Sequence, residues 1–277
     1  MTLNNRPVQA DVPAMEAEGE KVNAVLRSKK PEWVQGAISE ADARFLAGLI
    51  GLLRPIKVVE IGVASGWSGT VMLRAMWPEP DPPVPTDDRR VYGIDLVPDL
   101  YTDKSLRTGA AISEVAPDLA HKYTMQTGHY SFELMPKIGP VDFAFIDAHH
   151  GHPWPALDLI AVMPFLKAGA WVALHDLNLC RFERHNHRNR GPYYLYYLWA
   201  GHRVHSLQSP PMIGAIQLQE PALNYFDDVL EILCTPWELE LAPSFIERWR
   251  VFVQDHFGAS NAERFVSACR VGNWAKS

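Results

Sequence analysis

A short apolar run followed at once by closely spaced small residues most constrains what this sequence can fold into. The run, 58–61, carries Glu60 near its end, and small residues then stand at every second position: Gly62, Ala64 and Gly66. The pattern predicts a buried strand, a tight turn and a helix start, where backbone N–H groups approach a ligand closely. A second predicted strand, 90–95, ends in Asp95, and an acid there typically binds ribose hydroxyls in Rossmann-like folds. Together the two features indicate a nucleoside-containing cofactor.

Strands and helices are predicted to alternate along most of the chain. Strands are expected at 57–62, 90–95, 122–126, 141–146, 170–174, 202–207 and 212–218, and helices at 67–77, 103–115, 131–137, 153–166 and 192–200. Successive strands with helices between them argue for a parallel, doubly wound sheet. The predicted fold class is therefore α/β, with a Rossmann-like, doubly wound, seven-stranded and mostly parallel sheet.

The segments on either side of this sheet are predicted to differ from it. Residues 1–13 are expected to be disordered or loosely attached, and a polar helix is predicted at 14–29. Ser39 and Asp42 resemble a helix N-cap arrangement, and the tail, 221–277, is expected to contain helices only. The predicted units are an N-terminal tail and helix (1–35), a cofactor-binding domain (36–218) and a C-terminal helical extension (219–277).

Composition limits the classes of function. The 277 residues carry a net charge of -6, which disfavours a nucleic-acid-binding surface because phosphate contacts need clustered Lys and Arg. The three cysteines are far apart in the sequence and fit a reducing cytoplasm better than a disulfide framework. No apolar core follows the N-terminus and no uncharged apolar run reaches about 18 residues, so neither a signal peptide nor a membrane helix is expected. The predicted location is cytoplasmic.

The order of residues in the turn discriminates between cofactors. A dinucleotide-binding turn has the spacing G-x-G-x-x-G, whereas the order here is Glu60-x-Gly62-x-Ala64-x-Gly66. A charged Glu60 would repel a pyrophosphate and attract a cationic ligand. S-adenosylmethionine (SAM) carries a sulfonium and an ammonium, so it fits this requirement. An ordinary tight turn without a ligand is the alternative.

The segment 59–68 resembles motif I of class I SAM-dependent methyltransferases. The resemblance implies that the backbone from Gly62 to Gly66 cups the methionine part of SAM, that Asp95 holds the ribose, and that the loop after 122–126 lies beside the adenine. The gap between Glu60 and Asp95 is longer than usual, and a proline-rich loop at 78–89 accounts for the excess. The residues implied to hold SAM are Glu60, Gly62, Ala64, Ser65, Gly66, Ser68, Asp95, Gly128, His129 and Asp147.

A narrower resemblance appears in the second half of the predicted sheet. Residues 141–150, V-D-F-A-F-I-D-A-H-H, are similar to a block of methyltransferase family 24. Further landmarks similar to that family are Asp158, 164–170, 174–176, Gly191-Pro192 and 213–216. Departures from the family pattern are Ala148, His149 and Ala168. The resemblance covers about residues 36–218 and implies that this range is a SAM-dependent methyltransferase domain.

Two acids follow neighbouring predicted strands. Asp147 comes just past 141–146 and Asp176 just past 170–174. Neighbouring strands lie about 4.8 Å apart, and their carboxyl ends face the ligand crevice. Two carboxylates there can hold Mg²⁺ or Ca²⁺, which would orient and acidify a substrate hydroxyl. The related catechol-type O-methyltransferases use this arrangement, with Asp-Asn where this chain has His175-Asp176. The alternative is that Asp147 touches only substrate or water and that Asp176 caps the next helix.

Histidines cluster shortly after Asp147. We predict that His150 is the general base for a hydroxyl, because an imidazole titrates near neutral pH and this one would lie at the pocket mouth. Asp147 is the second predicted catalytic residue, shared between SAM and the metal or substrate. A zinc or iron site is the alternative, built from Asp147 and a set of histidines: His149, His150, His152 and His175.

Three other clusters have both a structural and a functional interpretation. The basic run 181–190, with His185 and His187, is a solvated loop or a lid over an anionic substrate. The aromatic cluster from Tyr193 to Trp199 is core or a subunit contact, or else lines an acceptor pocket. The tail aromatics pack on the sheet or form a dimer interface: Trp237, Phe245, Trp249, Phe252, Phe257 and Phe265.

Together these features predict SN2 transfer of a methyl group from SAM to a hydroxyl oxygen of a small molecule, such as a sugar or a secondary metabolite. The alternatives are an NAD-dependent oxidoreductase, a non-catalytic SAM-fold interaction module, and an N-methyltransferase that needs neither metal nor base. No nucleic-acid or membrane partner is expected, and a homodimer stays open. The acceptor itself depends on pocket loops, which the fold does not fix.

Overall fold

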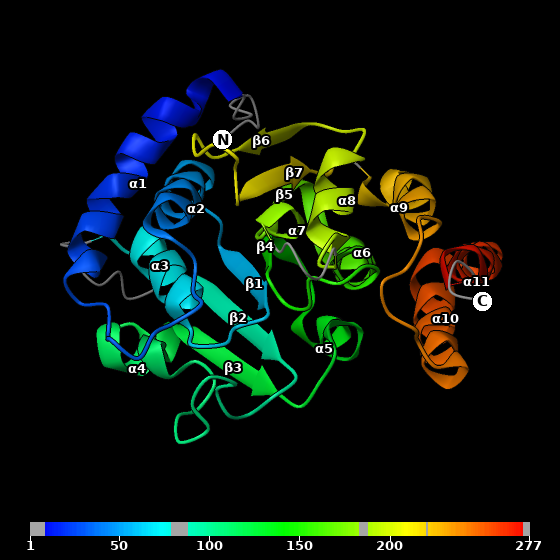
Figure 1. The fold of residues 1–277 in the computed structure, drawn as a ribbon, viewed down its shortest axis with the longest axis horizontal. Coiled ribbons are helices and arrows are strands. Elements are labelled where there is room, and N and C mark those ends of the chain that lie inside the picture. Colours follow the sequence, from blue (N-terminus) through cyan, green and yellow to red (C-terminus); the bar gives the residue numbers. More distant parts are fainter. Residues whose placement is uncertain (1–8, 79–87, 183–187, 220, 274–277) are drawn as a thin grey trace.

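Seven strands form one sheet at the centre of the structure, a computed structural model that describes residues 9–78, 88–182, 188–219 and 221–273 (Figure 1). The strands are β1 (Lys57–Ile61), β2 (Arg90–Asp95), β3 (Tyr123–Thr127), β4 (Val141–Ile146), β5 (Leu166–Leu174), β6 (Arg203–His205) and β7 (Gly214–Gln217). Their order in the sheet is β3-β2-β1-β4-β5-β7-β6. Strands β1 to β5 are parallel, and β7 is antiparallel to both β5 and β6. The predicted fold class is confirmed.

Helices cover both faces of the sheet (Figure 1). One face packs against α1 (Val12–Arg27), α2 (Glu40–Leu53), α3 (Trp67–Met76) and α4 (Ala110–Val115). The other packs against α5 (Ser131–Ile138), α6 (Trp154–Val162), α8 (Gly191–Tyr197), α9 (Phe226–Leu233), α10 (Pro243–Phe257) and α11 (Ala259–Asn273). A short helix, α7 (Leu179–Phe182), follows β5. None of the helices in the described ranges is long and apolar enough to cross a membrane.

The polarity of the sheet places a crevice beside β1. From β1 the chain moves outward through β2 and β3, and it then returns to β4 on the other side of β1. In open α/β sheets, ligands bind outside the carboxyl ends of the strands at the point where the strand order reverses. The residues that follow β1, β2, β4 and β5 therefore meet at one edge of the sheet.

Helix α2 begins where its sequence predicts. Ser39 Oγ accepts the Asp42 N–H (3.2 Å), and the Asp42 carboxylate accepts the Ser39 N–H (3.1 Å), which makes a capping box. At the other end, Arg54 adopts the left-handed conformation just before Pro55. The predicted N-cap is thus confirmed, and it fixes the position of Asp42 at the edge of the sheet where the crevice lies.

The N-terminal segment is attached more firmly than expected. Gln9 exchanges two hydrogen bonds of 2.9 Å with the backbone of His205 in β6, and Glu16 accepts the Leu207 N–H (2.7 Å). Within the described part of 1–13, the expectation of a loose segment is therefore wrong. The contacts satisfy backbone groups of an edge strand, which would otherwise stay unpaired.

One helix is shorter than predicted. The helix expected at 103–115 is α4, which begins only at Ala110. Asp103 instead accepts the Ser105 N–H (2.9 Å) in an Asx turn, and Gly109 adopts a φ of 84°. Side chains of this type offer the backbone an alternative to helix formation.

The aromatic clusters are mostly core. Tyr196 and Trp199 of the cluster after Gly191 are buried among the residues of α6, α8 and α9. Of the tail aromatics, Trp237, Trp249, Phe252 and Phe265 are buried in the same core, and Phe245 and Phe257 pack against it. These aromatics pack against helices, with Trp249 and Phe252 next to Phe132 of α5 and Phe257 next to Phe226 of α9, so they extend the core on that side of the sheet.

Two predicted features lie mostly or wholly outside the described residues. They are the proline-rich loop at 78–89, of which only both ends are described, and the histidines His185 and His187 of the basic run.

Candidate active site

A cavity of about 370 Å³ opens at the carboxyl ends of β1, β2, β4 and β5. The predicted site residues in its wall are Gly62, Ala64, Asp95, His129, Asp147, His150 and Asp176. The predicted SAM-binding residues outside its wall are Glu60, Ser65, Gly66, Ser68 and Gly128. A larger hollow of about 860 Å³ lies between α1 and α2, but none of the predicted site residues lines it. The cavity at the strand ends is therefore the candidate site.

The turn after β1 is held by the acid after β2. Asp95 Oδ2 accepts the N–H groups of Val63 (2.9 Å) and Ala64 (3.1 Å), and its Oδ1 accepts that of Val97 (3.0 Å). Gly62, with a φ of 87°, allows the turn to touch the next strand, since a Cβ there would lie 2.2 Å from the Asp147 carbonyl oxygen. Asp95 thus shapes the turn and also faces the cavity.

The outer side of the same turn packs against the protein instead of the cavity. The Ala64 and Ser65 carbonyls accept the N–H groups of Gly109 (2.9 Å) and Ala111 (3.0 Å). A Cβ on Gly66 would lie 2.8 Å from the Gly109 Cα. Gly66 and Ser65 therefore allow the turn to fit against the start of α4, which explains the small residues without direct ligand contact.

Glu60 is turned away from the cavity. Successive side chains of a strand point to opposite faces, so Glu60 lies on the face covered by α3 and α4, where it is fully buried. Its carboxyl accepts hydrogen bonds from Ser68 Oγ and the Tyr123 hydroxyl. Burial raises the pKa of Glu60 to about 8, against the lowering effect of both hydrogen bonds. The expectation of a charged Glu60 that faces the ligand is therefore corrected: its contacts support the turn from behind.

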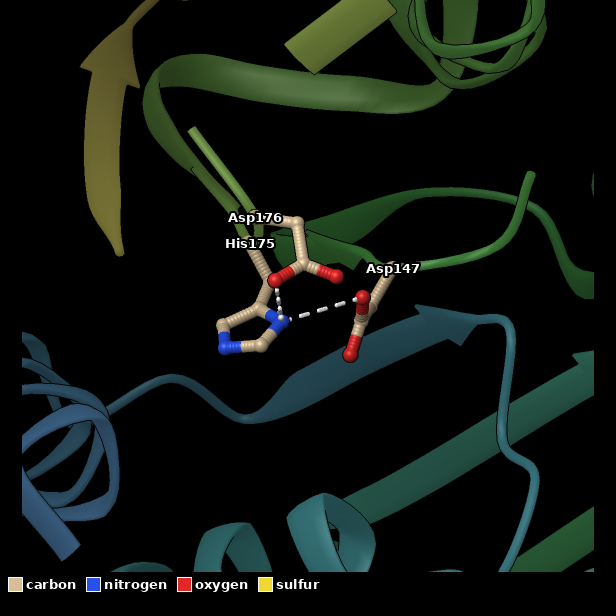
Figure 2. Close-up of side chains that lie close together, drawn as sticks. All are labelled: Asp147, His175 and Asp176. Carbon is tan, nitrogen blue, oxygen red and sulfur yellow. Dashed lines mark hydrogen bonds and ion pairs between the residues drawn. The ribbon is translucent and has the colours of Figure 1, made fainter. Parts of the chain in front are cut away.

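Asp147, His175 and Asp176 converge at the ends of β4 and β5, and Figure 2 shows both carboxyl groups turned toward one ring nitrogen of His175. His175 Nδ1 lies 3.2 Å from Asp147 Oδ1 and 3.5 Å from Asp176 Oδ1. One ligand atom from each residue lies within 4.8 Å of the others. The two predicted acids are thus brought together, with His175 as a third donor.

The opposite ring nitrogen of His175 faces a carboxylate from a distant part of the chain. His175 Nε2 lies 3.3 Å from Asp42 Oδ2, the acid of the α2 capping box. Both side chains are almost completely buried. His175 is therefore enclosed by carboxylates on two sides, from Asp42 behind and from Asp147 and Asp176 in front.

His150 completes the cluster at the cavity wall. Its Nε2 lies 3.2 Å from Asp147 Oδ1 and 3.2 Å from Asp176 Oδ2. Burial alone would lower the pKa of His150, but the hydrogen bond and charge of Asp147, together with the charge of Asp176, raise it on balance. His150 therefore lies at the pocket, as predicted. Its raised pKa means that the two carboxylates stabilise the protonated imidazole.

The buried charges have strongly shifted pKa values. Burial alone would raise the pKa of Asp147, but the charge of His175 and hydrogen bonds from both histidines outweigh it and lower the pKa. Burial alone would lower the pKa of His175, yet the surrounding carboxylates hold it well above its usual range. For Asp176 burial dominates and raises the pKa. Such shifts in a cleft are typical of functional sites.

The remaining histidines of the loop separate from one another. His149 lines the cavity, and its Nδ1 accepts the Gly151 N–H (3.0 Å). His152 is fully buried, with its Nε2 3.0 Å from Thr235 Oγ1, and burial lowers its pKa to about 4. Within the described residues, the grouping of donors that suits an ion contains only one histidine, His175.

An aromatic wall closes the end of the cavity near β2 and α6. The rings of Tyr130 and Trp154 stack with centroids 5.8 Å apart and planes 3° apart, and Phe245 of α10 contacts both. Next to them, Ser131 Oγ donates to Asp158 Oδ1 (2.6 Å), and burial raises the pKa of Asp158 to about 7. Stacked rings beside a buried carboxyl suit a flat heteroaromatic ligand.

Some wall residues have no clear signal in the sequence. Tyr101, Tyr130 and Trp154 lie in loops or at helix starts, where an aromatic residue has many other uses. Asp42 has a signal, but the signal predicts a helix cap. Only the topology, which brings α2 to the end of β5, places it beside His175.

Comparisons with known proteins agree with the sequence motifs. The model of one family, described as a methyltransferase domain and numbered 24, matches residues 59–177. An O-methyltransferase from Bacillus cereus, solved in complex with SAH, is similar at 16% identity over 78% of this chain and 93% of that one, with a TM-score of 0.48. TomG is an O-methyltransferase from Streptomyces achromogenes involved in tomaymycin synthesis, and it was solved with SAM. It is 18% identical over 78% of this chain and 99% of TomG, with a TM-score of 0.48. A putative O-methyltransferase from Klebsiella pneumoniae is 14% identical over 78% of this chain and 92% of that one, with a TM-score of 0.49.

No curated protein matches the sequence. The family match runs from the strand before the turn to the residue after Asp176, so it spans the turn, Asp95, Asp147 and His150. Residues 59–177 of the chain are therefore similar to a methyltransferase domain.

Proposed function

We propose that the protein transfers the methyl group of SAM to a hydroxyl oxygen of a small molecule, within a domain that spans 36–218. The observation that carries the proposal is that Asp147, His150 and Asp176 line the same cavity as the turn after β1. His175 is buried behind them, with its Nδ1 next to Asp147. SAM would place its methionine part at Gly62 and Ala64, its ribose at Asp95, and its adenine near His129 and the Tyr130–Trp154 stack. The similarity of residues 59–177 to a methyltransferase domain supports the proposal.

His150 is the proposed base. In the transfer, the hydroxyl oxygen attacks the methyl carbon as the bond to sulfur breaks, the hydroxyl proton passes to His150, and S-adenosylhomocysteine leaves. The two carboxylate neighbours of His150 raise its pKa on balance, which favours the protonated imidazole in the free protein. It would accept the hydroxyl proton only after it has released its own.

The donor set at the ends of β4 and β5 fits a divalent cation. Asp147 and Asp176 supply carboxylate oxygens and His175 supplies Nδ1, and these atoms lie close enough to share one ion. When bound, such an ion would orient the hydroxyl and lower its pKa. The same three residues would hold it while His150 faces the substrate.

Methyl transfer from labelled SAM to a panel of hydroxyl compounds, with and without EDTA, tests the proposal. We expect turnover of one or more hydroxyl acceptors, loss of that activity in EDTA, and recovery with added divalent ions. Full activity in EDTA together with an unaffected Asp176→Ala variant would remove the metal-assisted version and favour an N-methyltransferase. Absence of turnover with every acceptor would favour a non-catalytic module.

A further inference from the structure

We infer that Asp42 is a positioning residue that fixes His175 as a nitrogen ligand, so that the site prefers a first-row transition-metal ion such as Mn²⁺ over Mg²⁺. The inference rests on the proposed cation site and deepens it. The proposed ligand set does not consist of oxygen atoms alone, because it includes His175, which stands directly before Asp176 at the end of β5.

The first step is the anchoring of Asp42. Its Oδ2 accepts hydrogen bonds from Ser39 N (3.1 Å) and Ser39 Oγ (2.6 Å) and faces His175 Nε2 at 3.3 Å. Its Oδ1 is buried and has no hydrogen-bond partner among the described residues. All donors to Asp42 therefore converge on the one oxygen that faces the histidine, and the capping box prevents the carboxylate from turning away.

The second step is the tautomer of His175. An ionised carboxylate only accepts hydrogen bonds, so the nitrogen that faces Asp42 must carry a proton. The neighbouring carboxylates favour a second proton on Nδ1, and an ion that displaced this proton would leave a lone pair on Nδ1, which lies next to Asp147 Oδ1 and Asp176 Oδ1. Metal-binding histidines in general donate their second N–H to a carboxylate or carbonyl, which fixes ring orientation and raises ligand basicity. Asp42 occupies this supporting position.

The third step is the kind of ion. Mg²⁺ and Ca²⁺ take oxygen ligands, whereas divalent ions of the first-row transition metals also bind an imidazole nitrogen. The ring of His175 has little freedom to withdraw, because it is almost completely buried and its centroid lies 6.4 Å from that of Phe145. A site with one fixed nitrogen and two carboxylates therefore discriminates against Mg²⁺.

Calorimetric titration of the EDTA-treated full chain with Mn²⁺ and with Mg²⁺ tests the inference. We expect Mn²⁺ to bind more tightly than Mg²⁺, because Mg²⁺ prefers oxygen ligands only. Asp42→Ala should weaken Mn²⁺ binding by about 10- to 100-fold, the usual effect of losing such a supporting group. Ser39→Ala, which removes the cap hydroxyl but keeps the carboxylate, is the matched control and should weaken Mn²⁺ binding less.

Pulsed EPR of the Mn²⁺-loaded protein gives a second readout that does not depend on Asp42→Ala folding. The wild-type protein should show coupling to a histidine nitrogen, and His175→Asp should lose it and narrow the preference for Mn²⁺ over Mg²⁺. Equal affinity for the two ions, no binding of either, or no nitrogen coupling would overturn the inference. SAM titration of the same samples separates the two proposals: SAM binding without ion selectivity contradicts only the inference, whereas no SAM binding contradicts the proposed function.

Discussion

Glu60 shows how an acid in a motif can act through its neighbours. Its side chain is enclosed by Ser68, Tyr123 and two glycines, because a Cβ on Gly69 or Gly93 would clash with Glu60 or Tyr123. The turn that faces the cavity is thus supported from behind by a buried polar cluster. The sequence shows that an acid stands at position 60, but the direction of its side chain depends on the strand register and on β3.

The raised pKa of Glu60 predicts a pH dependence of stability. Between about pH 4.5 and 8 the folded protein keeps a proton that the unfolded chain has released, so the free energy of unfolding falls as pH rises. The slope from this group is at most about 1.4 kcal/mol per pH unit. Glu60→Gln mimics the protonated form, so its free energy of unfolding lacks the pH-dependent contribution of Glu60. Urea unfolding of both proteins at pH 5 and pH 8 should show the variant gaining relative stability at pH 8, whereas parallel pH profiles would contradict the assignment.

His150 is the residue on which the proposed chemistry depends most. His150→Gln should lower kcat for methyl transfer by about 10²- to 10⁴-fold, because a general base typically contributes that factor. The Kd for SAM should change little, since His150 is not among the residues proposed to hold SAM. The exposed His121, replaced by Gln, is the control. Unchanged turnover in His150→Gln would show that another group takes the proton.

At the scale of elements, the connection between α9 and α10 supports the loop that carries His150. Glu238 Oε2 accepts the N–H groups of His152 (2.8 Å) and Arg190 (3.0 Å), and so joins the loops on either side of the site. The Gly191 N–H in turn donates to the His150 carbonyl (2.9 Å). The extension beyond β7 is therefore part of the scaffold of the cavity.

Loss of the Glu238 carboxylate should destabilise the fold and the loops around the site. Glu238→Ala leaves two backbone N–H groups without their acceptor and should lower the free energy of unfolding by about 1–3 kcal/mol. Glu238→Gln keeps an acceptor oxygen and should lose less. Denaturant unfolding compares the two variants. An Ala variant as stable as the wild type would show that the loops do not depend on the extension.

Helices α1 and α2 cross at two glycines. A Cβ on Gly48 would lie 2.0 Å from the Met15 carbonyl oxygen, and one on Gly19 would lie 1.9 Å from that of Arg44. Gly48→Ala should therefore destabilise the protein by about 1–3 kcal/mol or more through overpacking. Gly51, in the same helix, has no atom within 4 Å of such a Cβ, and Gly51→Ala should stabilise by up to about 1 kcal/mol. Thermal unfolding should move in opposite directions for the two variants, and a shift in the same direction would contradict this packing.

The elements themselves were largely predictable, for local reasons. Apolar runs, glycines and prolines mark the seven strands, and Ser39 with Asp42 marks the start of α2. The predictions that were wrong failed because long-range contacts, or local turns that compete with helix formation, decide the structure there. Gln9 is ordered by β6, far away in sequence, and Asp103 forms a turn where helical spacing alone predicts helix.

At the scale of the whole molecule, the parallel sheet explains which part of the site was predictable. The ends of β1, β2, β4 and β5 must meet at one edge, so Gly62, Asp95, Asp147 and Asp176 were expected together, and they line one cavity. Residues from outside that pattern, Asp42 and the Tyr130–Trp154 stack, enter through helix packing and loops. Their positions depend on contacts that no local spacing encodes.

Titration calorimetry of the purified protein with SAM and with NAD tests the central claim most directly. The class of cofactor separates a methyltransferase from an oxidoreductase on a similar sheet, and both ligands would use the same edge of that sheet. The account predicts that SAM binds and that NAD gives no measurable heat. Tight binding of NAD without binding of SAM would contradict it.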